Sequence, residues 1–518
     1  MMSEKNKLNG AESLVHTLVG HGLKVCFANP GTSEMHFVAA LDRIPGLRCI
    51  PGMQENVVTG MADGYARITR QPAITLLHCG PGLANGLANL HNAKRAHVPM
   101  LNIVGDQATY HAPFDPPLAA DTKALAKTVS HWVKTSKRAD RVGSDAASAV
   151  QAALTGAGQI ATLILPSDAS WTEGGKIAKP LSIPTKSKIR NARIDKAAKV
   201  LRQKSNVMIL LGGDALRAQP QKHAERIQAK TNCRVMAECI NGFHQRGSGR
   251  LPIERVPYPA PAAIDALKDV QHIITVCARG PVGFFAYPGV PSIHYPKDAR
   301  VISLCDIDQD ATDALEALAD AVSAHASPAT HSSRPTLPNG TPSSAAFGQM
   351  LAAVMPEQAI ITDESISFGA DLFKHSHNAP PHDWMMVTGG AIGYGMPCAT
   401  GAAVAGGDRR VINVQADGSA MYSLQSLWTQ AREKLPVTTV ILSNRRYQIL
   451  IAEYGNVGAN PGRTAMDMLD LGNPDLNWTK LANGMGVAAA KTATLEGCAD
   501  LMRQSFKSSQ PFLIELEI

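Results

Sequence analysis

Residues 409–448 read RRVINVQADGSAMYSLQSLWTQAREKLPVTTVILSNRRYQ, and this stretch gives the clearest indication of the fold class. It contains two short runs rich in branched apolar residues, 409–418 and 437–444, which predict buried strands. Between them, Met421 to Lys434 carry apolar side chains at helical spacing and predict an amphipathic helix. A strand, a helix and a second strand in this order predict a parallel unit, in which both strands end at the same edge of a sheet.

Polar side chains stand at the ends of both expected strands. Asp417 ends the first strand and Asn444 ends the second, with 26 residues between them. One carboxylate and one amide oxygen suit Mg²⁺, which completes its octahedral coordination with phosphate oxygens and water. Gly418 opens the turn after the first strand, where backbone N–H groups can bind a phosphate. The structural alternative is that Asp417 or Ser419 caps a helix and that Asn444 forms a turn.

The rest of the chain repeats this alternation of strands and helices. Apolar runs predict strands at 24–30, 73–79, 99–106, 206–213, 272–280, 299–308 and 359–365. Helical spacing predicts helices over Glu55 to Thr69 and over Gly82 to Ala96. Stretches rich in Gly, Pro and Ser predict linkers at 172–191 and 326–344. Together the patterns predict an α/β fold of three doubly wound parallel-sheet domains, at 1–172, 190–326 and 344–518.

Composition excludes several classes of protein. The chain has 518 residues, 45% hydrophobic and 18% charged, which is typical of a globular protein with more than one core. Its formal charge is +7, but Lys and Arg are scattered, so a nucleic-acid partner is not favoured. The nine cysteines form no CxxC pair, which favours reduced thiols in a cytoplasm. The N-terminal MMSEKNKLNGAESL lacks the apolar stretch of a signal, and no run of about 18 apolar residues occurs, so we expect a cytoplasmic protein without a membrane partner.

A second carboxylate stands in the stretch QENVVTGMADGYAR, residues 54–67. Glu55 falls in the first turn of an expected helix that is apolar on one face. The structural interpretation is that this carboxylate complements the helix dipole. The functional interpretation is that it transfers a proton inside a dry pocket, where its pKa is tuned by the surroundings.

These stretches resemble a known family. Ala416 to Ser419 with Asn444 resemble the thiamine-diphosphate signature, a GDG followed by about two dozen residues and an Asn pair. Two positions depart from that signature, because Ala416 replaces its first Gly and Ser443 replaces the first Asn. Residues 54–67 resemble the family's Glu helix, and TGGAIGYGMP at 388–397 resembles the segment beneath the cofactor. The resemblance covers nearly the full chain and points to the acetolactate synthase (large subunit) and benzoylformate decarboxylase group, with thiamine diphosphate and Mg²⁺ as cofactors.

The resemblance implies roles for individual residues. Asp417 and Asn444 would bind Mg²⁺ through their side chains, and Arg446 would bind it through its backbone carbonyl. Glu55 would serve proton transfer at the aminopyrimidine ring. Ile392 would separate the two rings of the cofactor, and the Gly390 carbonyl would accept a hydrogen bond from the amino group. The positions implied in cofactor binding are Asn29, Pro30, Gly31, Asn85, Ser365, Ser367, Gly390, Ile392, Gly418 and Ser419.

Other positions bear on the substrate. Thr32 occupies the position of a substrate-contacting Ser in benzoylformate decarboxylase, and His78 stands where that enzyme carries a catalytic His. A lone His at a strand end can also be structural, so both interpretations stay open. The GPG motif with Asn85 resembles acetolactate synthases instead. Phe284 and Phe285 stand where benzoylformate decarboxylase offers a second His, which favours an apolar substrate cavity.

We therefore expect an enzyme that decarboxylates a 2-oxo acid. After CO₂ leaves, the product takes either a proton, giving an aldehyde, or a second carbonyl, giving an acyloin such as acetolactate. Two alternatives come from other classes: an NAD- or flavin-dependent oxidoreductase, which the missing GxGxxG motif disfavours, and a catalytically silent cofactor-binding subunit. The resemblance also implies a homodimer or homotetramer, in which Glu55 and Asp417 of different subunits serve one cofactor.

Overall fold

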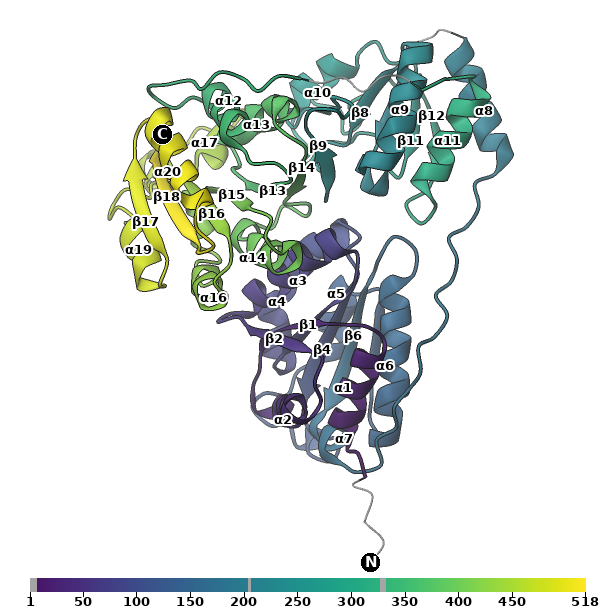
Figure 1. The fold of residues 1–518 in the computed structure, drawn as a ribbon, viewed down its shortest axis with the longest axis vertical. Helices are drawn as coiled ribbons and strands as arrows, with labels where there is room; N and C mark the ends of the chain where they lie inside the picture. The colour runs from purple at the N-terminus through teal and green to yellow at the C-terminus, as the bar shows by residue number, and fades with distance from the viewer. Residues whose placement is uncertain (1–6, 204–205, 327–331) are drawn as a thin grey trace, which may run out of the picture. The chain divides into compact units, whose positions relative to one another are not determined.

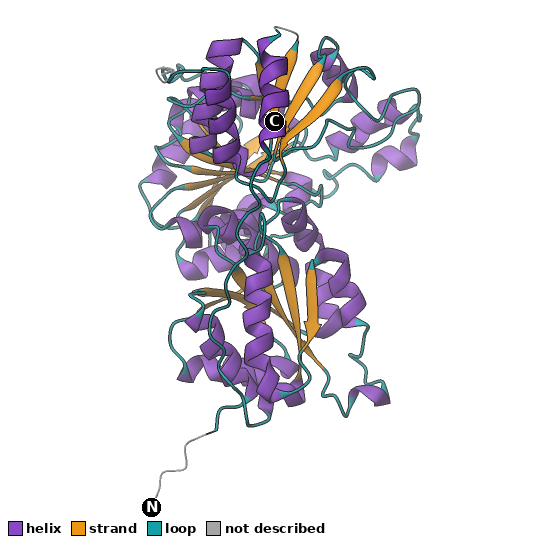
Figure 2. Ribbon diagram, turned by 90° about the vertical axis from the view of Figure 1, so that its right-hand side faces the viewer, coloured by secondary structure: helices purple, strands orange, loops and turns teal. Residues whose placement is uncertain are grey.

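The computed structural model describes residues 7–203, 206–326 and 332–518, which form three sheets with helices packed against them (Figures 1 and 2). Residues 1–6 of the expected N-terminal stretch and residues 327–331 of the expected linker 326–344 lie outside the described residues. By their internal contacts, the residues divide into two compact units. The first comprises Met1–Thr185, Thr388–Asp408 and Tyr422–Val437, and the second comprises Lys186–Val387, Arg409–Met421 and Thr438–Ile518.

The first unit contains a six-stranded sheet in the order β2-β1-β3-β4-β6-β5, in which all neighbours are parallel. Its strands are β1 (Val25–Asn29), β2 (Arg48–Pro51), β3 (Ala73–Leu77), β4 (Met100–Asp106), β5 (Trp132–Thr135) and β6 (Ile160–Pro166). Its helices are α1 (Gly10–Gly20), α2 (Met35–Arg43), α3 (Glu55–Thr69), α4 (Cys79–Arg95), α5 (Thr122–Val129), α6 (Ala139–Leu154) and α7 (Ser167–Trp171). The chain reverses its direction of winding between β1 and β3. In doubly wound sheets, ligands bind at the carboxyl ends of the strands at such a switch point.

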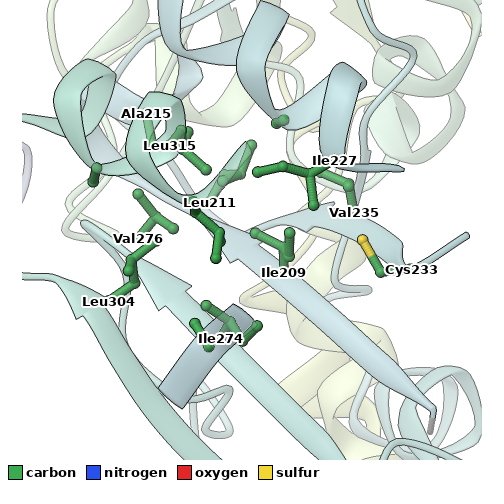
Figure 3. Close-up of a cluster of buried hydrophobic side chains, with 14 of the residues drawn as sticks. Ile209, Leu211, Ala215, Ile227, Cys233, Val235, Ile274, Val276, Leu304 and Leu315 are labelled. Atoms are coloured by element: carbon green, nitrogen blue, oxygen red, sulfur yellow. The ribbon is translucent and has the colours of Figure 1, made fainter. Parts of the chain in front are cut away.

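The second unit begins with a five-stranded parallel sheet in the order β10-β8-β7-β11-β12. Its strands are β7 (Val207–Leu211), β8 (Arg234–Ala237), β10 (Glu254–Arg255), β11 (His272–Val276) and β12 (Arg300–Cys305), and its helices are α8 (Asn191–Arg202), α9 (Ala218–Thr231), α10 (Ala260–Leu267) and α11 (Ala311–Ala321). Side chains of β7, β8, β11 and β12 meet those of α9 and α11 in a buried apolar cluster (Figure 3). The central strands β7 and β11 are buried along nearly their whole length, which explains why they read as continuous apolar runs.

The second unit also contains a seven-stranded sheet in the order β17-β18-β16-β15-β13-β14-β9. Its strands are β9 (His244–Arg246), β13 (Ile360–Glu364), β14 (His382–Met386), β15 (Val411–Ala416), β16 (Val437–Ser443), β17 (Ala488–Thr492) and β18 (Phe512–Glu517). The helices that follow in this part of the chain are α12 (Ser344–Val354), α13 (Leu372–His375), α15 (Asp417–Ala420), α17 (Gln448–Val457), α18 (Arg463–Asp467), α19 (Trp478–Gly484) and α20 (Leu495–Phe506). The short strand β9 pairs antiparallel with β14, although it lies far from it in the sequence. The winding reverses between β13 and β15, so the switch point lies where Glu364 and Ala416 end these strands.

Two helices from the C-terminal third of the sequence belong to the first unit. They are α14 (Gly395–Gly406) and α16 (Ser426–Glu433). Helix α14 packs across α3 at very short range, because a Cβ atom at Gly64 would overlap the carbonyl of Cys398 and one at Gly401 would overlap the carbonyl of Met61. Glycine is required at both positions by the close approach of the two backbones.

The structure confirms the fold class and most of the expected elements. The expected strands are present, and α3 spans the range expected for it. Helix α4 begins at Cys79 rather than Gly82, since Pro81 in its first turn needs no N–H partner.

The helix expected over Met421 to Lys434 is wrong in extent. It begins only at Ser426, after a turn, and ends where Lys434 is left-handed with φ 53°. Tyr422 packs against Gly393 instead of continuing the helix, so a tertiary contact overrides the apolar period.

The helices can be compared with the length and hydropathy that a membrane span requires. Throughout the described ranges, every helix is too short or too polar to cross a bilayer.

Candidate functional site

The first cluster of expected site residues, the Asp417 site, lies in the second unit at the end of β15. Asp417 is only 3% exposed. Its Oδ1 accepts a hydrogen bond from the Gly418 N–H at 2.8 Å, and its Oδ2 accepts one from the Arg445 N–H at 2.6 Å. Burial raises the pKa of Asp417, whereas these backbone donors and the N–H of Asn444 lower it. The structure therefore brings Asp417 beside the loop after β16, as the β-α-β pattern predicts.

The donors of the Asp417 site fit a magnesium ion. Asn444 is half-buried, and its Oδ1 accepts from the Arg446 N–H at 3.1 Å, so that amide oxygen already faces the loop. The Asp417 carboxylate and this oxygen are hard donors, which Mg²⁺ prefers to nitrogen or sulfur. A Cβ atom at Gly418 would come within 2.5 Å of the Tyr447 ring, so only glycine allows the backbone to lie this close. The chemistry of the site thus agrees with a metal that a phosphate group helps to coordinate.

Polar residues beneath the Asp417 site form a buried chain of hydrogen bonds. Ser419 Oγ donates to the Ala416 carbonyl at 3.1 Å and accepts from Gln415 Nε2 at 2.6 Å. Gln415 Nε2 also donates to Glu364 Oε2 at 2.8 Å, which links the ends of β15 and β13. This chain fixes the turn at Gly418, and the Ser419 hydroxyl is engaged within it.

Ser365 and Ser367 follow β13 at the same edge of the sheet. Ser365 is buried, and its Oγ and N–H both donate to Asp363 Oδ1, at 2.5 and 3.1 Å. Ser367 is half-buried and precedes the short 3-10 helix Phe368–Asp371. Both residues lie at the switch point of the sheet, but the Ser365 hydroxyl is already bonded to a carboxylate.

The glycine-rich segment 388–397 lies in the first unit, and two of its glycines have left-handed backbone conformations. Gly390 has φ 74° and is exposed, and Gly393 has φ 89° and is buried. Ile392 between them is half-buried. These positive φ angles turn the segment sharply ahead of α14, and they favour glycine over any residue with a Cβ atom.

Asparagine side chains of α4 hold this segment in place. Asn92 Oδ1 accepts from the N–H groups of Gly389 and Ala391 at 3.0 and 3.3 Å, and Asn92 Nδ2 donates to the Ala391 carbonyl at 2.8 Å. Asn89 Nδ2 donates to the Gly393 carbonyl at 3.2 Å. Both asparagines are fully buried. Their amides mimic the pairing of a neighbouring strand, so they fix a segment that has no regular partner.

The sequence analysis missed these two asparagines, although a signal for them exists. Asn85, Asn89 and Asn92 recur at helical spacing, on one face of an otherwise apolar helix. A buried amide needs hydrogen-bond partners, so two of them on a packed face indicate an irregular segment nearby. The same region holds a buried ion pair between Asp63 and Arg67, and the Arg67 guanidinium also donates to Thr388 Oγ1 at 3.2 Å.

The second cluster of expected residues, the Glu55 site, also lies in the first unit. Glu55 begins α3, after Gln54, whose side chain accepts from the Val57 N–H at 3.1 Å. The Glu55 carboxylate is half-buried and accepts a hydrogen bond from Asn85 Nδ2 at 3.1 Å. A Cβ atom at Gly82 would lie 3.3 Å from Glu55 Oε1 and 3.4 Å from the His78 Cβ, so the carboxylate passes close over the first turn of α4. Three of the expected residues, Glu55, Asn85 and His78, therefore lie together.

His78 is held by a loop at the end of β1. Its Nδ1 lies 3.0 Å from Glu34 Oε2 and 3.0 Å from Ser33 Oγ. Glu34 is 3% exposed and also accepts from the Gly31 N–H at 2.7 Å. A carboxylate partner at Nδ1 favours the tautomer that carries its proton there, which leaves Nε2 as an acceptor. Glu34, which the sequence analysis did not select, thus sets the orientation of His78.

The remaining residues of the β1 loop are placed as follows. Asn29 ends β1 and is half-buried, Pro30 and Thr32 are exposed, and Gly31 lies so close to the His78 ring that a Cβ atom would overlap it. Cys79 follows His78 and is buried. Burial raises the pKa of the Cys79 thiol to about 11, and the carboxylates of Glu34 and Asp106 add to this, whereas a hydrogen bond with Ser33 opposes it.

Phe284 and Phe285 form an exposed aromatic group in the second unit. Their ring centroids are 4.9 Å apart, and Phe284 lies 5.6 Å from the ring of Tyr258. Burial and a hydrogen bond with Glu453 of α17 raise the pKa of the neighbouring Tyr287 to about 12. The aromatic group is therefore linked to the helix that directly follows the Asn444 loop.

Two family models match the chain. Residues 8–130 match the model described as "Thiamine pyrophosphate enzyme, N-terminal TPP binding domain", and residues 367–516 match its counterpart for the C-terminal TPP binding domain. The first covers the Glu55 site, and the second covers the Asp417 site. The chain belongs to the thiamine pyrophosphate enzymes.

Its curated relatives are named as acetolactate synthases and benzoylformate decarboxylases. The chain is 47% identical over 514 residues to a Mycobacterium tuberculosis protein named "Putative acetolactate synthase large subunit IlvX", covering 99% of each chain. It is 27% identical to a benzoylformate decarboxylase of Pseudomonas aeruginosa, covering 96% of each chain.

A solved structure agrees with the fold. The thiamine diphosphate-dependent 4-hydroxybenzoylformate decarboxylase of Rhodococcus jostii superposes with a TM-score of 0.85 at 24% identity, over 98% of this chain and 99% of that one.

The hydrogen bonds from Asn92 to the glycine-rich segment can be tested by substitution. In Asn92→Ala, the N–H groups of Gly389 and Ala391 lose their acceptor, which should lower the local free energy of opening by about 2–4 kcal/mol. Hydrogen exchange measured by mass spectrometry on peptides covering 388–394 should then be at least about tenfold faster. Asn483→Ala serves as the control, because Asn483 is exposed in α19. Equal exchange in Asn92→Ala and wild type would show that Asn92 does not hold the segment.

Proposed function

We propose that this protein uses thiamine diphosphate and Mg²⁺ to decarboxylate a 2-oxo acid and to pass the remaining acyl group to a second carbonyl, as an acetolactate synthase does. The observation that carries the proposal is the Glu55 site, in which a helix-end carboxylate lies against Asn85 and beside His78 at the switch point of a parallel sheet. Family membership and the 47% identical relative support the assignment.

The residues of the Asp417 site would hold the cofactors. The side chains of Asp417 and Asn444 and the carbonyl of Arg446 would bind Mg²⁺, and the backbone at Gly418 would lie against the diphosphate. When bound, thiamine diphosphate supplies a nucleophilic carbon and an electron sink for the electron pair that CO₂ leaves behind. Backbone N–H groups that no Cβ atom shields, such as those at Gly418, suit the binding of a diphosphate.

The residues of the Glu55 site would handle protons. Glu55 would hold a proton at the pyrimidine ring, and its bond from Asn85 would keep the carboxyl group in place. His78 would exchange a proton with the substrate oxygen through Nε2, since Nδ1 is held by Glu34. In the glycine-rich segment, Ile392 would pack between the cofactor rings and the Gly390 carbonyl would accept from the amino group.

A second candidate is a simple 2-oxo acid decarboxylase of the benzoylformate decarboxylase type. The contact between Glu34 and His78 favours it, because a firmly oriented histidine can deliver a proton and end the reaction at the aldehyde. Product analysis with a panel of 2-oxo acids separates the two candidates, since carboligation gives an acyloin and simple decarboxylation gives an aldehyde.

We also propose that the enzyme works as a homodimer or homotetramer, with Glu55 and Asp417 of different subunits serving one cofactor. Two observations support this. The family resemblance implies it, and the Glu55 site and the Asp417 site belong to different compact units. Light scattering at micromolar concentration should give at least twice the mass of one chain. A monomer with full specific activity would overturn this part of the proposal.

The test of the proposed function is Glu55→Gln. The substitution keeps size and polarity but removes the group that exchanges a proton, so kcat should fall by about a hundredfold or more. The rate at which deuterium from the solvent enters bound thiamine diphosphate should fall in parallel, without substrate. Glu316→Gln on α11 serves as the control, because that carboxylate is exposed. Deuterium exchange as fast as in wild type would show that Glu55 is only a helix-end carboxylate without a role in proton transfer.

A further inference from the structure

Three different donor atoms meet beside His78. A carboxylate oxygen of Glu34, a ring nitrogen of His78 and the Sγ of Cys79 all lie within 4.8 Å of one another. Glu34 follows β1, whereas His78 and Cys79 follow β3 at the start of α4, and these two strands flank the switch point of the first sheet. None of the roles proposed above uses the thiol.

The three donor residues all contact one atom, the hydroxyl oxygen of Ser33. Ser33 Oγ is hydrogen-bonded to Glu34 Oε1, lies 3.0 Å from His78 Nδ1 and lies 3.2 Å from Cys79 Sγ. A tetrahedral Zn²⁺ site with bonds of about 2.0–2.3 Å places its donors about 3.3–3.8 Å apart. The donors are therefore within about 1 Å of that spacing, and rotation of the Ser33 side chain would clear the centre.

The backbone holds the donors in this arrangement. Neighbouring residues usually point apart, yet His78 and Cys79 both contact the same oxygen of Ser33. Cys79 has φ 52°, a left-handed conformation that is rare without glycine and that turns its side chain toward the loop. Glu34 is fixed by the Gly31 N–H and fills the space above Gly105, where a Cβ atom would overlap its carboxylate.

The combination of donors selects the metal. Mg²⁺ takes oxygen ligands, whereas a thiolate, an imidazole and a carboxylate together suit Zn²⁺. Three protein donors leave a fourth position for water. His78 keeps 23% of its side chain exposed, whereas Glu34 and Cys79 are buried, so the imidazole is the part of the site nearest to solvent.

We infer that Glu34, His78 and Cys79 form a binding site for Zn²⁺, separate from the magnesium site at Asp417. A bound ion takes Nδ1 of His78 from Glu34 and displaces the Ser33 hydroxyl. With the ion on Nδ1, the ring proton moves to Nε2, which then no longer accepts a proton, so zinc inhibits any activity that needs Nε2 of His78 as an acceptor. The site does not rest on the proposed function, because its residues bind the ion whatever reaction the enzyme performs.

The test uses Co²⁺ as a spectroscopic substitute for Zn²⁺ in the full-length protein, with excess Mg²⁺ present and no thiamine diphosphate. Oxygen ligands at Asp417 and Asn444 give no thiolate band, so an intense thiolate-to-cobalt absorption in the near ultraviolet reports only a cysteine site. We expect this band to saturate at one ion per chain and to disappear when Zn²⁺ is added. No band in wild type overturns the inference.

Variants assign the band to this site. Cys79→Ser should abolish it, and Glu34→Gln should weaken Co²⁺ binding by at least about tenfold. Cys49→Ser is the control, because Cys49 is a half-buried thiol on β2 of the same unit, outside the three donors, and it should keep the band. Circular dichroism spectra equal to wild type show that the variants fold. A band that survives in folded Cys79→Ser, or that is lost in Cys49→Ser, overturns the site.

Discussion

Parallel strands end at the same edge of their sheet, and this constraint gathers the polar side chains of the protein into sites. In the first unit, β1 and β3 end side by side, so residues 45 positions apart, Ser33 and His78, come into hydrogen-bond contact. In the second unit, β15 and β13 end side by side, which links Gln415 to Glu364. The central strands β3 and β16 are buried along their whole length, and the polar site residues lie in the loops and helix starts that follow the strands.

The loops after these strands need support, because irregular backbone leaves N–H and C=O groups without partners. Asn89 and Asn92 supply it for the glycine-rich segment. The Gly418 turn is supported by Gln415 and Ser419, and Glu34 supports the loop that carries it. Each supporting group is buried, so its loss would leave several polar atoms unsatisfied. These residues act by holding the loops in position.

Local patterns in the sequence predicted much of this arrangement. Apolar runs identified the strands, and the spacing from Asp417 to Asn444 identified two loops that the structure brings together. The residues that were missed act through tertiary contacts. Glu34 and Asn92 look like ordinary polar residues until the partners 44 and nearly 300 positions away are placed. The turn at Met421 and the pairing of β9 with β14 likewise depend on distant neighbours, which no local period encodes.

We propose that the Asp417 site holds thiamine diphosphate through Mg²⁺, while the Glu55 site serves proton transfer. Calorimetric titration of thiamine diphosphate into the protein with excess Mg²⁺ tests it most directly. We expect Glu55→Gln to bind as wild type does, because the metal and diphosphate contacts remain. We expect Asp417→Ala to release no heat of binding at concentrations that saturate wild type. Wild-type affinity in Asp417→Ala would contradict this proposal.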